Sequence, residues 1–310
     1  MVLGITYGDE QYTTSIKLNK WSLKTFGRVD VIQDFKRSDI DRDFYEANRK
    51  VLDCKRGGGY WLWKPYFILK ALNSVNEGDY VLFIDAGAIV IKSIKKLIRI
   101  MERDSQPIFL SSSLLQNGDW CKKQTLIAMG CDCDAAKKRP QPEGGFVLLK
   151  KCNKSYEFVN EWLKYAKNFD LISDCSEKES RDQYPSFHEH RHDQAIMSNV
   201  SYKMGIEPYK GVGRRSEYCY YVRFGNDFFG YTREDLIKLY LTERNRDFFK
   251  NSNYGRIVIN TRIDTNEKGK FLYLLVRKLS EALLCDTYGV LMSKYYVSKF
   301  LRKNKKLNAK

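Results

Sequence analysis

The stretch that most constrains the fold is residues 79–91, DYVLFIDAGAIVI. Its apolar part, 80–84, is rich in β-branched and aromatic residues, which is typical of a strand buried on both faces of a mostly parallel sheet. The run ends abruptly in Asp85, Ala86 and Gly87. Ligands of open α/β sheets bind at the carboxyl ends of the strands. We therefore expect Asp85 to face a ligand, directly or through a divalent cation. The alternative is an Asp that only caps a helix or starts a turn.

The start of the chain predicts an α/β fold. Residues 2–7 predict a strand, 11–26 a helix that stops at Gly27, and 29–32 a second strand. Such a βαβ unit favours a parallel sheet with a right-handed crossover, although the GxGxxG fingerprint of dinucleotide binding is missing. We expect a Rossmann-like, mixed and mostly parallel sheet flanked by helices. Further strands are predicted at 107–111, 143–151 and 256–262, and further helices at 39–54, 65–72, 93–103, 118–129, 153–169, 193–203 and 233–251.

Charge divides the chain into two parts. The 310 residues carry a formal net charge of +16, which indicates anionic partners. Much of this charge lies in residues 268–310, which hold 11 Lys or Arg and 2 acids. We predict one domain at 1–262 and a basic, amphipathic helical tail at 263–310 that lies on an anionic membrane surface. The alternative is a solvated basic helix packed on the domain. No apolar run reaches the roughly 18 residues of a membrane span.

Cysteine usage predicts a reducing compartment. The eight cysteines show no CxxC pair and no zinc-finger spacing, and the chain starts without a signal-peptide pattern. We therefore expect free thiols and a cytoplasmic protein, held peripherally at the inner face of the cell membrane by its tail. The tight pair Cys131 and Cys133 has no nearby His, so a metal site there is disfavoured.

Residues 55–65, KRGGGYWLWKP, combine glycine with positive charge. Gly57–Gly59 after Arg56 predict a flexible turn whose backbone N–H groups approach an anion closely. Pro65 suits the first position of a helix, and Lys64 at that N-terminus is favourable when an anion lies there too. The alternatives are a plain loop hinge for the glycines and core packing for the two tryptophans. A second basic glycine segment, 211–215, also suits phosphate.

All three histidines of the chain fall within residues 187–198, FHEHRHDQAIMS. One hypothesis is a transition-metal site built from His188, His190 and His192. The other is that His192 opens a helix whose N-terminus faces the pocket and presents Asp193 as a catalytic carboxylate. Ordinary helix capping also explains Asp193.

Glycine also leads the strand predicted at 143–151. Gly144 and Gly145 at its start permit close approach by a ligand or by another backbone. Glu143 directly precedes them, which makes it a second candidate for a catalytic carboxylate.

These segments together carry a resemblance to a known family. A βαβ opening, RGGGYWLWKP, DAG, EGGF and HRHDQ, in this order, resemble bacterial polysaccharide-assembly glycosyltransferases of the GT-A fold, enzymes of O-antigen and capsule synthesis. The resemblance covers about residues 1–262. It implies a nucleotide-sugar donor and a saccharide or polyprenyl-linked acceptor. Asp85 matches the first carboxylate of the D-x-D motif that holds Mn²⁺ or Mg²⁺, whereas Gly87 stands in place of the second, so basic residues take over part of the charge neutralisation.

The resemblance also implies roles for individual residues. Asp193 and Glu143 are the expected catalytic carboxylates, in an inverting or a retaining reaction. The expected donor-binding residues are Tyr7, Arg56, Gly58, Lys64, Asp85, Ala86 and Gly87. The expected sugar- and acceptor-binding residues are Gly144, Gly145, His192 and Gln194.

Other functions fit parts of the sequence. A nucleotidyltransferase shares the donor chemistry. A nucleic-acid-binding protein accounts for the charge and the aromatic residues, but it predicts bases interleaved with aromatics on an exposed sheet face rather than charge concentrated in a tail. A carbohydrate-binding module accounts for the aromatic residues alone. We expect no nucleic-acid partner.

Overall fold

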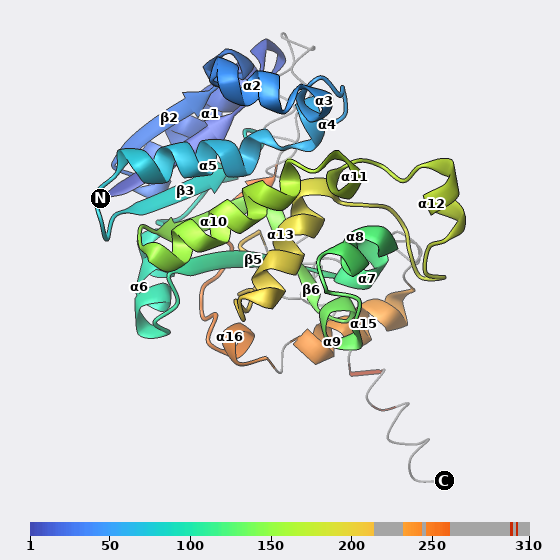
Figure 1. The fold of residues 1–310 in the computed structure, drawn as a ribbon. Coiled ribbons are helices and arrows are strands. Elements are labelled where there is room, and N and C mark those ends of the chain that lie inside the picture. The colour runs from blue at the N-terminus through green and yellow to red at the C-terminus, as the bar shows by residue number, and fades with distance from the viewer. Residues whose placement is uncertain (214–231, 244–245, 261–297, 300–301, 303–310) are drawn as a thin grey trace.

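A five-stranded sheet forms the centre of the computed structural model, which describes residues 1–213, 232–243, 246–260, 298–299 and 302 (Figure 1). The strand order is β2-β1-β3-β6-β5. Strands β1 and β2, and β1 and β3, pair in parallel, while β6 is antiparallel to both of its neighbours. Four of the five strands therefore point the same way, and the predicted mixed, mostly parallel α/β sheet is confirmed. The strands are β1 (Val2–Tyr7), β2 (Val31–Phe35), β3 (Tyr80–Ile84), β5 (Ile108–Gln116) and β6 (Pro140–Lys150).

Helices cover both faces of this sheet. One face packs against α5 (Trp63–Ser74), α10 (Asn153–Ala166) and α13 (His192–Lys203), which lie together in front of the strands (Figure 1). The other face packs against η2 (Leu23–Gly27), which continues α1 (Thr13–Ser22), and against α6 (Lys95–Arg103). Every residue of β3 is buried, as its apolar composition predicts for a strand covered on both sides.

Shorter elements complete the fold. They are η1 (Glu10–Tyr12), η3 (Arg37–Asp39), α2 (Arg42–Ala47), α3 (Arg49–Leu52), α4 (Gly57–Tyr60), α7 (Asn117–Trp120), α8 (Lys123–Ala128), α9 (Asp134–Lys137), α11 (Phe169–Ile172), α12 (Glu177–Arg181), α15 (Arg233–Glu243) and α16 (Asp247–Lys250). The segment that carries α12 extends away from the sheet (Figure 1).

Several predicted boundaries are wrong. The second strand lies at Val31–Phe35 rather than 29–32: its pairing with β1 begins at Val31, and the buried Val29 precedes it. The helix predicted at 39–54 is broken into α2 and α3, and the one at 118–129 into α7 and α8. Pro65 is the third residue of α5 rather than the first. That position also tolerates Pro, since the first-turn N–H groups have no partner within the helix.

A small second sheet lies beside the end of β3. Strand β4 (Ala88–Val90) follows the turn at Asp85 and pairs antiparallel with β7 (Val258–Asn260). The strand predicted at 256–262 is therefore confirmed in its centre. This pairing fixes the chain that leaves the carboxyl end of β3.

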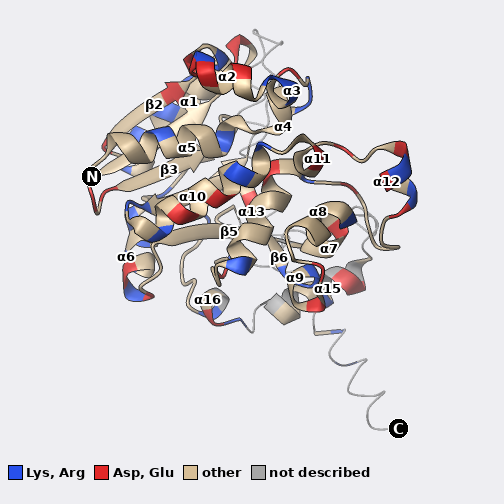
Figure 2. Cartoon of the chain, viewed as in Figure 1, with Lys and Arg blue, Asp and Glu red and all other residues tan. Residues whose placement is uncertain are grey.

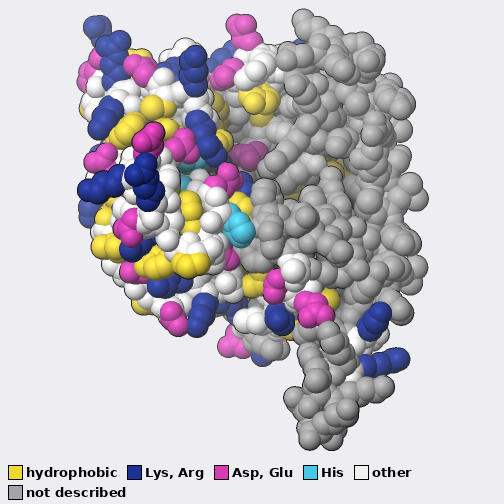
Figure 3. All heavy atoms as spheres, turned by 90° about the vertical axis from the view of Figure 1, so that its right-hand side faces the viewer, with side chains coloured by type: hydrophobic (Ala, Val, Ile, Leu, Met, Phe, Trp, Pro, Cys, Tyr) yellow, Lys and Arg dark blue, Asp and Glu magenta, His cyan; other side chains and the backbone are white. Residues whose placement is uncertain are grey.

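Charged side chains of both signs alternate on the outer elements. Figure 2 shows acidic and basic residues side by side on α12, and Figure 3 shows the two signs interleaved over the described part of the face on that side. The predicted tail at 263–310, apart from residues 298–299 and 302, lies outside the described residues, as do Arg214 and Arg215. In the described part of the chain, no helix is both long and apolar enough to cross a membrane.

Candidate active site

Asp85 lies at the carboxyl end of β3, as predicted. Its backbone N–H donates to the carbonyl of Gly145 at 3.0 Å, and its carbonyl accepts the N–H of Ala88 at 3.0 Å. The buried amide of Asn19 on α1 clamps this turn, since Nδ2 donates to the carbonyls of Asp85 at 3.3 Å and Ala88 at 2.8 Å. The Asp85 side chain is 49% exposed. The turn is thus fixed while its carboxylate remains open to a ligand.

A buried ammonium group joins Asp85 to a second carboxylate. Lys64, near the start of α5, places Nζ 3.6 Å from Asp85 Oδ1 and 3.5 Å from Asp193 Oδ2. It also donates to the carbonyl of Gly144 at 3.1 Å. Burial lowers the pKa of Lys64, but the two carboxylates outweigh burial and raise the pKa overall. Lys64 is therefore a fixed positive charge at the strand ends.

Asp193 is the buried member of this cluster. It is the second residue of α13, and its side chain is 4% exposed. Its carbonyl accepts the indole N–H of Trp162 at 3.0 Å. Burial raises the pKa of Asp193 to about 7 in spite of the neighbouring Lys64, and Asp85 raises it further. This carboxyl group therefore exchanges its proton near neutral pH.

Gly144 and Gly145 leave the space in which the charged groups meet. A Cβ atom on Gly145 would lie 2.6 Å from Asp85 Oδ2, closer than side chains approach each other. A Cβ atom on Gly144 would lie 3.3 Å from Lys64 Nζ and 3.4 Å from Asp193 Oδ2. The two glycines lie inside β6 rather than at its start, and the groups close to them are the charged side chains of the cluster. The predicted approach of a ligand stays a prediction.

A chain of buried amides holds the other side of Gly144. The N–H of Gly144 donates to Gln194 Oε1 at 3.0 Å, and Gln194 Nε2 donates to Gln141 Oε1 at 2.8 Å. Gln141 Nε2 donates to Asn117 Oδ1 at 3.1 Å, and Asn117 Nδ2 donates to Asn199 Oδ1 at 2.8 Å. Each bond fixes the orientation of the next amide. Sequence reasoning found Gln194 but missed the other three, because their partners are far away along the chain.

Three strained residues meet beside this cluster. Tyr60, Trp61 and His192 have φ angles of 49°, 60° and 47°, in the left-handed region that non-glycine residues rarely adopt. The His192 ring lies 4.9 Å from the Tyr60 ring and 5.4 Å from the Trp61 ring, between centroids. Strained backbone of this kind concentrates at functional sites, so this contact supports a functional role for the surroundings of Asp193.

The glycine run forms a left-handed turn, and the anion contact predicted for it stays a prediction. Gly57, Gly58 and Gly59 all have positive φ, and the N–H of Gly58 donates to the carbonyl of Lys55. An added Cβ on Gly57 would lie 2.4 Å from the Trp61 ring, so the turn requires glycine there. At Gly58 the nearest atoms would be Trp63 Nε1 at 3.8 Å and the Tyr7 hydroxyl at 4.0 Å.

Tyr7, at the end of β1, lies against the same turn. Its ring stacks on Trp63 with centroids 3.9 Å apart and 19° between the planes. Burial raises the pKa of Tyr7 to about 12, so the hydroxyl stays protonated and remains a hydrogen-bond donor.

Arg56 faces acidic groups at the rim. Its guanidinium lies 2.9 Å from Asp174 and 3.5 Å from Glu189. Tyr60 donates to the same Asp174 at 3.2 Å. The predicted contact of Arg56 with a phosphate stays a prediction.

The histidine rings contact backbone carbonyls and aromatic side chains. His190 Nε2 lies 2.9 Å from the carbonyl of Leu171, and His192 Nδ1 lies 2.8 Å from the carbonyl of Ile172. Burial lowers the pKa of His192 to about 4 and that of His190 well below its usual range, so both rings are neutral. His188 packs on Trp120. Within the described ranges, no three His, Cys, Asp or Glu residues are grouped to hold a metal ion.

Glu143 is turned toward β5. Its Oε2 accepts the hydroxyl of Ser111 at 2.9 Å. The structure therefore brings Lys64, Asp85, Asp193 and the two glycines together, while Glu143 is held by a neighbouring strand.

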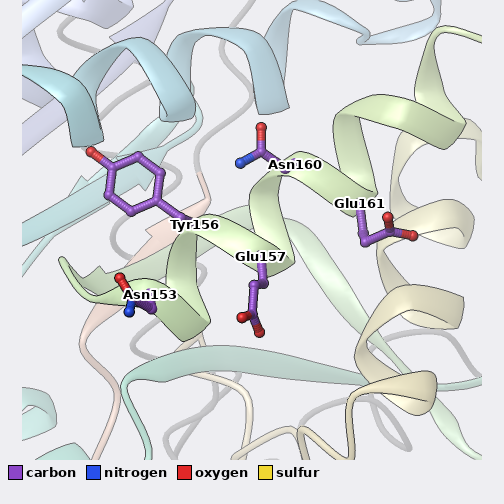
Figure 4. A pocket seen from close by; sticks show the side chains of 5 residues that line it. All are labelled: Asn153, Tyr156, Glu157, Asn160 and Glu161. Carbon is purple, nitrogen blue, oxygen red and sulfur yellow. The ribbon is translucent and has the colours of Figure 1, made fainter.

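A shallow hollow on α10 is separate from this cluster. Figure 4 shows that it is lined by side chains of one helix only: Asn153, Tyr156, Glu157, Asn160 and Glu161. None of them belongs to the charged cluster of Lys64, Asp85 and Asp193. We place the candidate site at that cluster, at the ends of β1 and β3.

The cluster fits a divalent cation only in part. Asp85 is open to a ligand, but one of its oxygens faces Lys64, whose ammonium lies between the two carboxylates. Mg²⁺ commonly binds through one or two carboxylates together with substrate phosphates. Asp85 is thus suited to be one protein ligand of a cation shared with a diphosphate.

Comparison with solved structures finds glycosyltransferases. The chain is similar to mouse xyloside xylosyltransferase 1 in its apo form, at 9% identity over 85% of this chain and 98% of the other, with a TM-score of 0.46. It is similar to the galactosyltransferase LgtC in complex with donor and acceptor sugar analogues, at 15% identity over 88% and 95%, with a TM-score of 0.42. The bifunctional glycosyltransferase WbbM matches at 12% identity over 84% and 46%, with a TM-score of 0.44. No family model and no curated protein matches the sequence.

Proposed function

We propose that this chain is a glycosyltransferase that moves a sugar from a nucleotide-sugar donor to a saccharide or lipid-linked saccharide acceptor in surface polysaccharide synthesis. The observation that carries the proposal is the position of Lys64 between Asp85 and Asp193 at the carboxyl end of β3. Lys64, Asp85 and Asp193 supply, in this order, a fixed positive charge, an open carboxylate and a buried carboxyl group at the edge where α/β sheets bind ligands.

The positive charge suits a diphosphate leaving group. When a nucleoside diphosphate departs, negative charge develops on a phosphate oxygen, and preorganised cations lower the energy of that transition state. Lys64 is buried and held by three oxygens, so it needs little reorganisation. In this proposal Asp85 orients the donor, alone or with Mn²⁺ or Mg²⁺, and such a cation would supply Lewis-acid stabilisation of the leaving phosphate. Ala86, Gly87 and Gly58 line the donor side.

The carboxyl group of Asp193 suits proton transfer or charge stabilisation on the acceptor side. An effective general base has a pKa near the working pH, and burial brings that of Asp193 to about 7. In this proposal Asp193 accepts the proton of the acceptor hydroxyl, or stabilises the electron-deficient sugar in a retaining reaction. Glu143 is the second candidate for this role. Gly144, Gly145, His192 and Gln194 form the sugar side of the pocket.

A panel of nucleotide sugars tests the proposal. We expect wild-type protein to release a nucleoside diphosphate slowly to water from at least one donor, with and without Mn²⁺ or Mg²⁺. Asp193→Ala should abolish transfer while donor binding stays within a few-fold, because a group acting on the transition state affects kcat more than ground-state affinity. Release of pyrophosphate, or transfer of the nucleotide itself, would instead indicate a nucleotidyltransferase.

We also propose that the basic tail, 263–310, attaches the enzyme to the anionic inner face of the cell membrane. The support is its charge, since seven Lys or Arg and no acid lie between Lys294 and Lys310. Co-sedimentation with anionic vesicles should fall as salt rises, because salt screens exposed charges. Truncation before Lys268 should weaken binding and keep activity on a soluble acceptor. Full-length protein that stays in the supernatant at low salt would contradict this proposal.

A further inference from the structure

Helix α1 and its continuation η2 expose an unusual combination of residues on the surface. Trp21 is 53% exposed and Phe26 is 42% exposed, and their rings meet edge to face with centroids 5.3 Å apart. Lys17, Lys24 and Arg28 are exposed around them. We call these five residues the basic aromatic face. Large aromatic side chains are usually buried, so an exposed pair with a rim of positive charge indicates an interaction surface.

The positive charge of this face is not neutralised locally. In the part of the chain that the structure describes, Lys17, Lys24 and Arg28 form no ion pair with an acid. Lys24 Nζ donates to the backbone carbonyl of Asp30 at 3.0 Å, while the Asp30 carboxylate accepts the N–H of Val2. The face therefore presents net positive charge to its surroundings.

We propose that the basic aromatic face binds an anionic phospholipid surface. Trp and Phe seat at the boundary between headgroups and acyl chains, while Lys and Arg stay among the headgroups. The exposed parts of two aromatic side chains amount to roughly 200 Å², well below the roughly 800 Å² that each partner of a stable protein complex buries. A membrane needs no such area, because shallow insertion and charge attraction act together.

The opposite side of α1 lies against the candidate active site. Asn19 holds the turn at Asp85, and the hydroxyl of Ser22 accepts the N–H of Val90 at 3.0 Å. One short helix thus has the Asp85 turn on one side and the basic aromatic face on the other. If the proposed sugar transfer to a lipid-linked acceptor holds, this contact would orient the donor edge relative to the membrane. Membrane binding itself does not depend on that reaction.

Vesicle binding by the full-length chain tests the inference. Phosphatidylcholine vesicles with and without phosphatidylglycerol are the probe. The triple variant Lys17→Gln, Lys24→Gln, Arg28→Gln should bind the anionic vesicles about a hundredfold more weakly, at about fivefold for each charge near the surface. The matched control replaces three exposed basic residues of α6, where no exposed aromatic residue accompanies them, by glutamine: Lys95, Lys96 and Arg99. Equal losses in the two triple variants would show non-specific charge attraction and overturn the proposal.

Lipid quenching of fluorescence tests the aromatic contact independently. Brominated lipids quench a Trp that enters the membrane, so vesicles containing them should dim the wild-type protein. Trp21→Phe should lose the quenched component while it keeps its fold and most of its binding. Ile127→Ser, at another exposed apolar residue, should change neither signal. Unchanged quenching in Trp21→Phe would overturn the proposal.

Discussion

The stability of the protein as a function of pH reports directly on Asp193. Burial raises its pKa from 3.8 to about 7, so between these pH values the folded protein holds a proton that the unfolded chain has released. The resulting contribution to stability is fully present below about pH 4 and is lost as pH rises through about 7. A difference of about three pH units corresponds to about 4 kcal/mol.

Asp193→Asn removes this titration while it keeps the size of the side chain. We expect the variant to gain about 4 kcal/mol in free energy of unfolding, relative to wild type, as pH rises from about 4 to about 8. Urea unfolding followed by tryptophan fluorescence at several pH values measures this difference. His190 and His192, whose pKa values burial lowers, titrate in both proteins, so their contributions cancel.

An exposed acid serves as the control. Asp134 pairs with Lys138 on the surface, and this pair lowers the pKa of Asp134. Its contribution is present at higher pH and lost as pH falls, so Asp134→Asn should show a small difference of the opposite sign. A constant difference between wild type and Asp193→Asn from about pH 4 to 8 would refute a raised pKa for Asp193. The proposed exchange of a proton near neutral pH would then fall as well.

The remaining predictions concern the donor side. Asp85→Asn should lower turnover at least about a hundredfold, whereas Asp134→Asn should not, and near-normal turnover of a folded Asp85→Asn protein would contradict the assignment. Gly145→Ala should lower the free energy of unfolding by about 1–3 kcal/mol in a urea titration and impair turnover, because the added Cβ would lie 2.6 Å from Asp85 Oδ2. Gly27→Ala is the control, since its added Cβ would lie 3.4 Å from its nearest neighbour. Equal effects of the two substitutions would argue against the contact with Asp85. Arg56→Gln should weaken nucleoside diphosphate binding in calorimetry. An unchanged affinity would show that Arg56 only forms ion pairs with Asp174 and Glu189 and does not contact the donor.

Sequence patterns predicted the centre of the fold well, because burial leaves a compositional mark. The run at Tyr80–Ile84 is apolar on both sides, and the structure buries all of it. Asp85 directly after it could therefore be placed at a strand end. The direction of β6 could not be predicted, since its continuous apolar run, Phe146–Leu149, is buried throughout and is typical of a parallel strand, whereas β6 runs antiparallel to both neighbours. Strand β6 also begins at Pro140, three residues before the strand predicted at 143–151.

The candidate site was predictable where a single residue type marks its function. The carboxylates, Lys64 and the paired glycines stand out because they interrupt apolar or periodic segments. Gln141 and Asn117 do not, because an amide in a polar segment is ordinary until its partner is known. Asn19 could not be found either, since its role depends on a turn that comes 66 residues later in the chain.

The left-handed turn before α5 affects the order in which the protein folds. An L-residue in this conformation costs about 1–2 kcal/mol of conformational free energy. Tyr60 and Trp61 therefore disfavour the turn until other parts of the chain pack against it. Their contacts with His192 offset that cost, and His192 belongs to a helix more than a hundred residues further on. We therefore expect the turn to close only after α13 has docked. Lys64 would then reach the two carboxylates in one of the last steps of folding, and a chain that ends before α13, or in which α13 has not docked, would carry no assembled charge cluster.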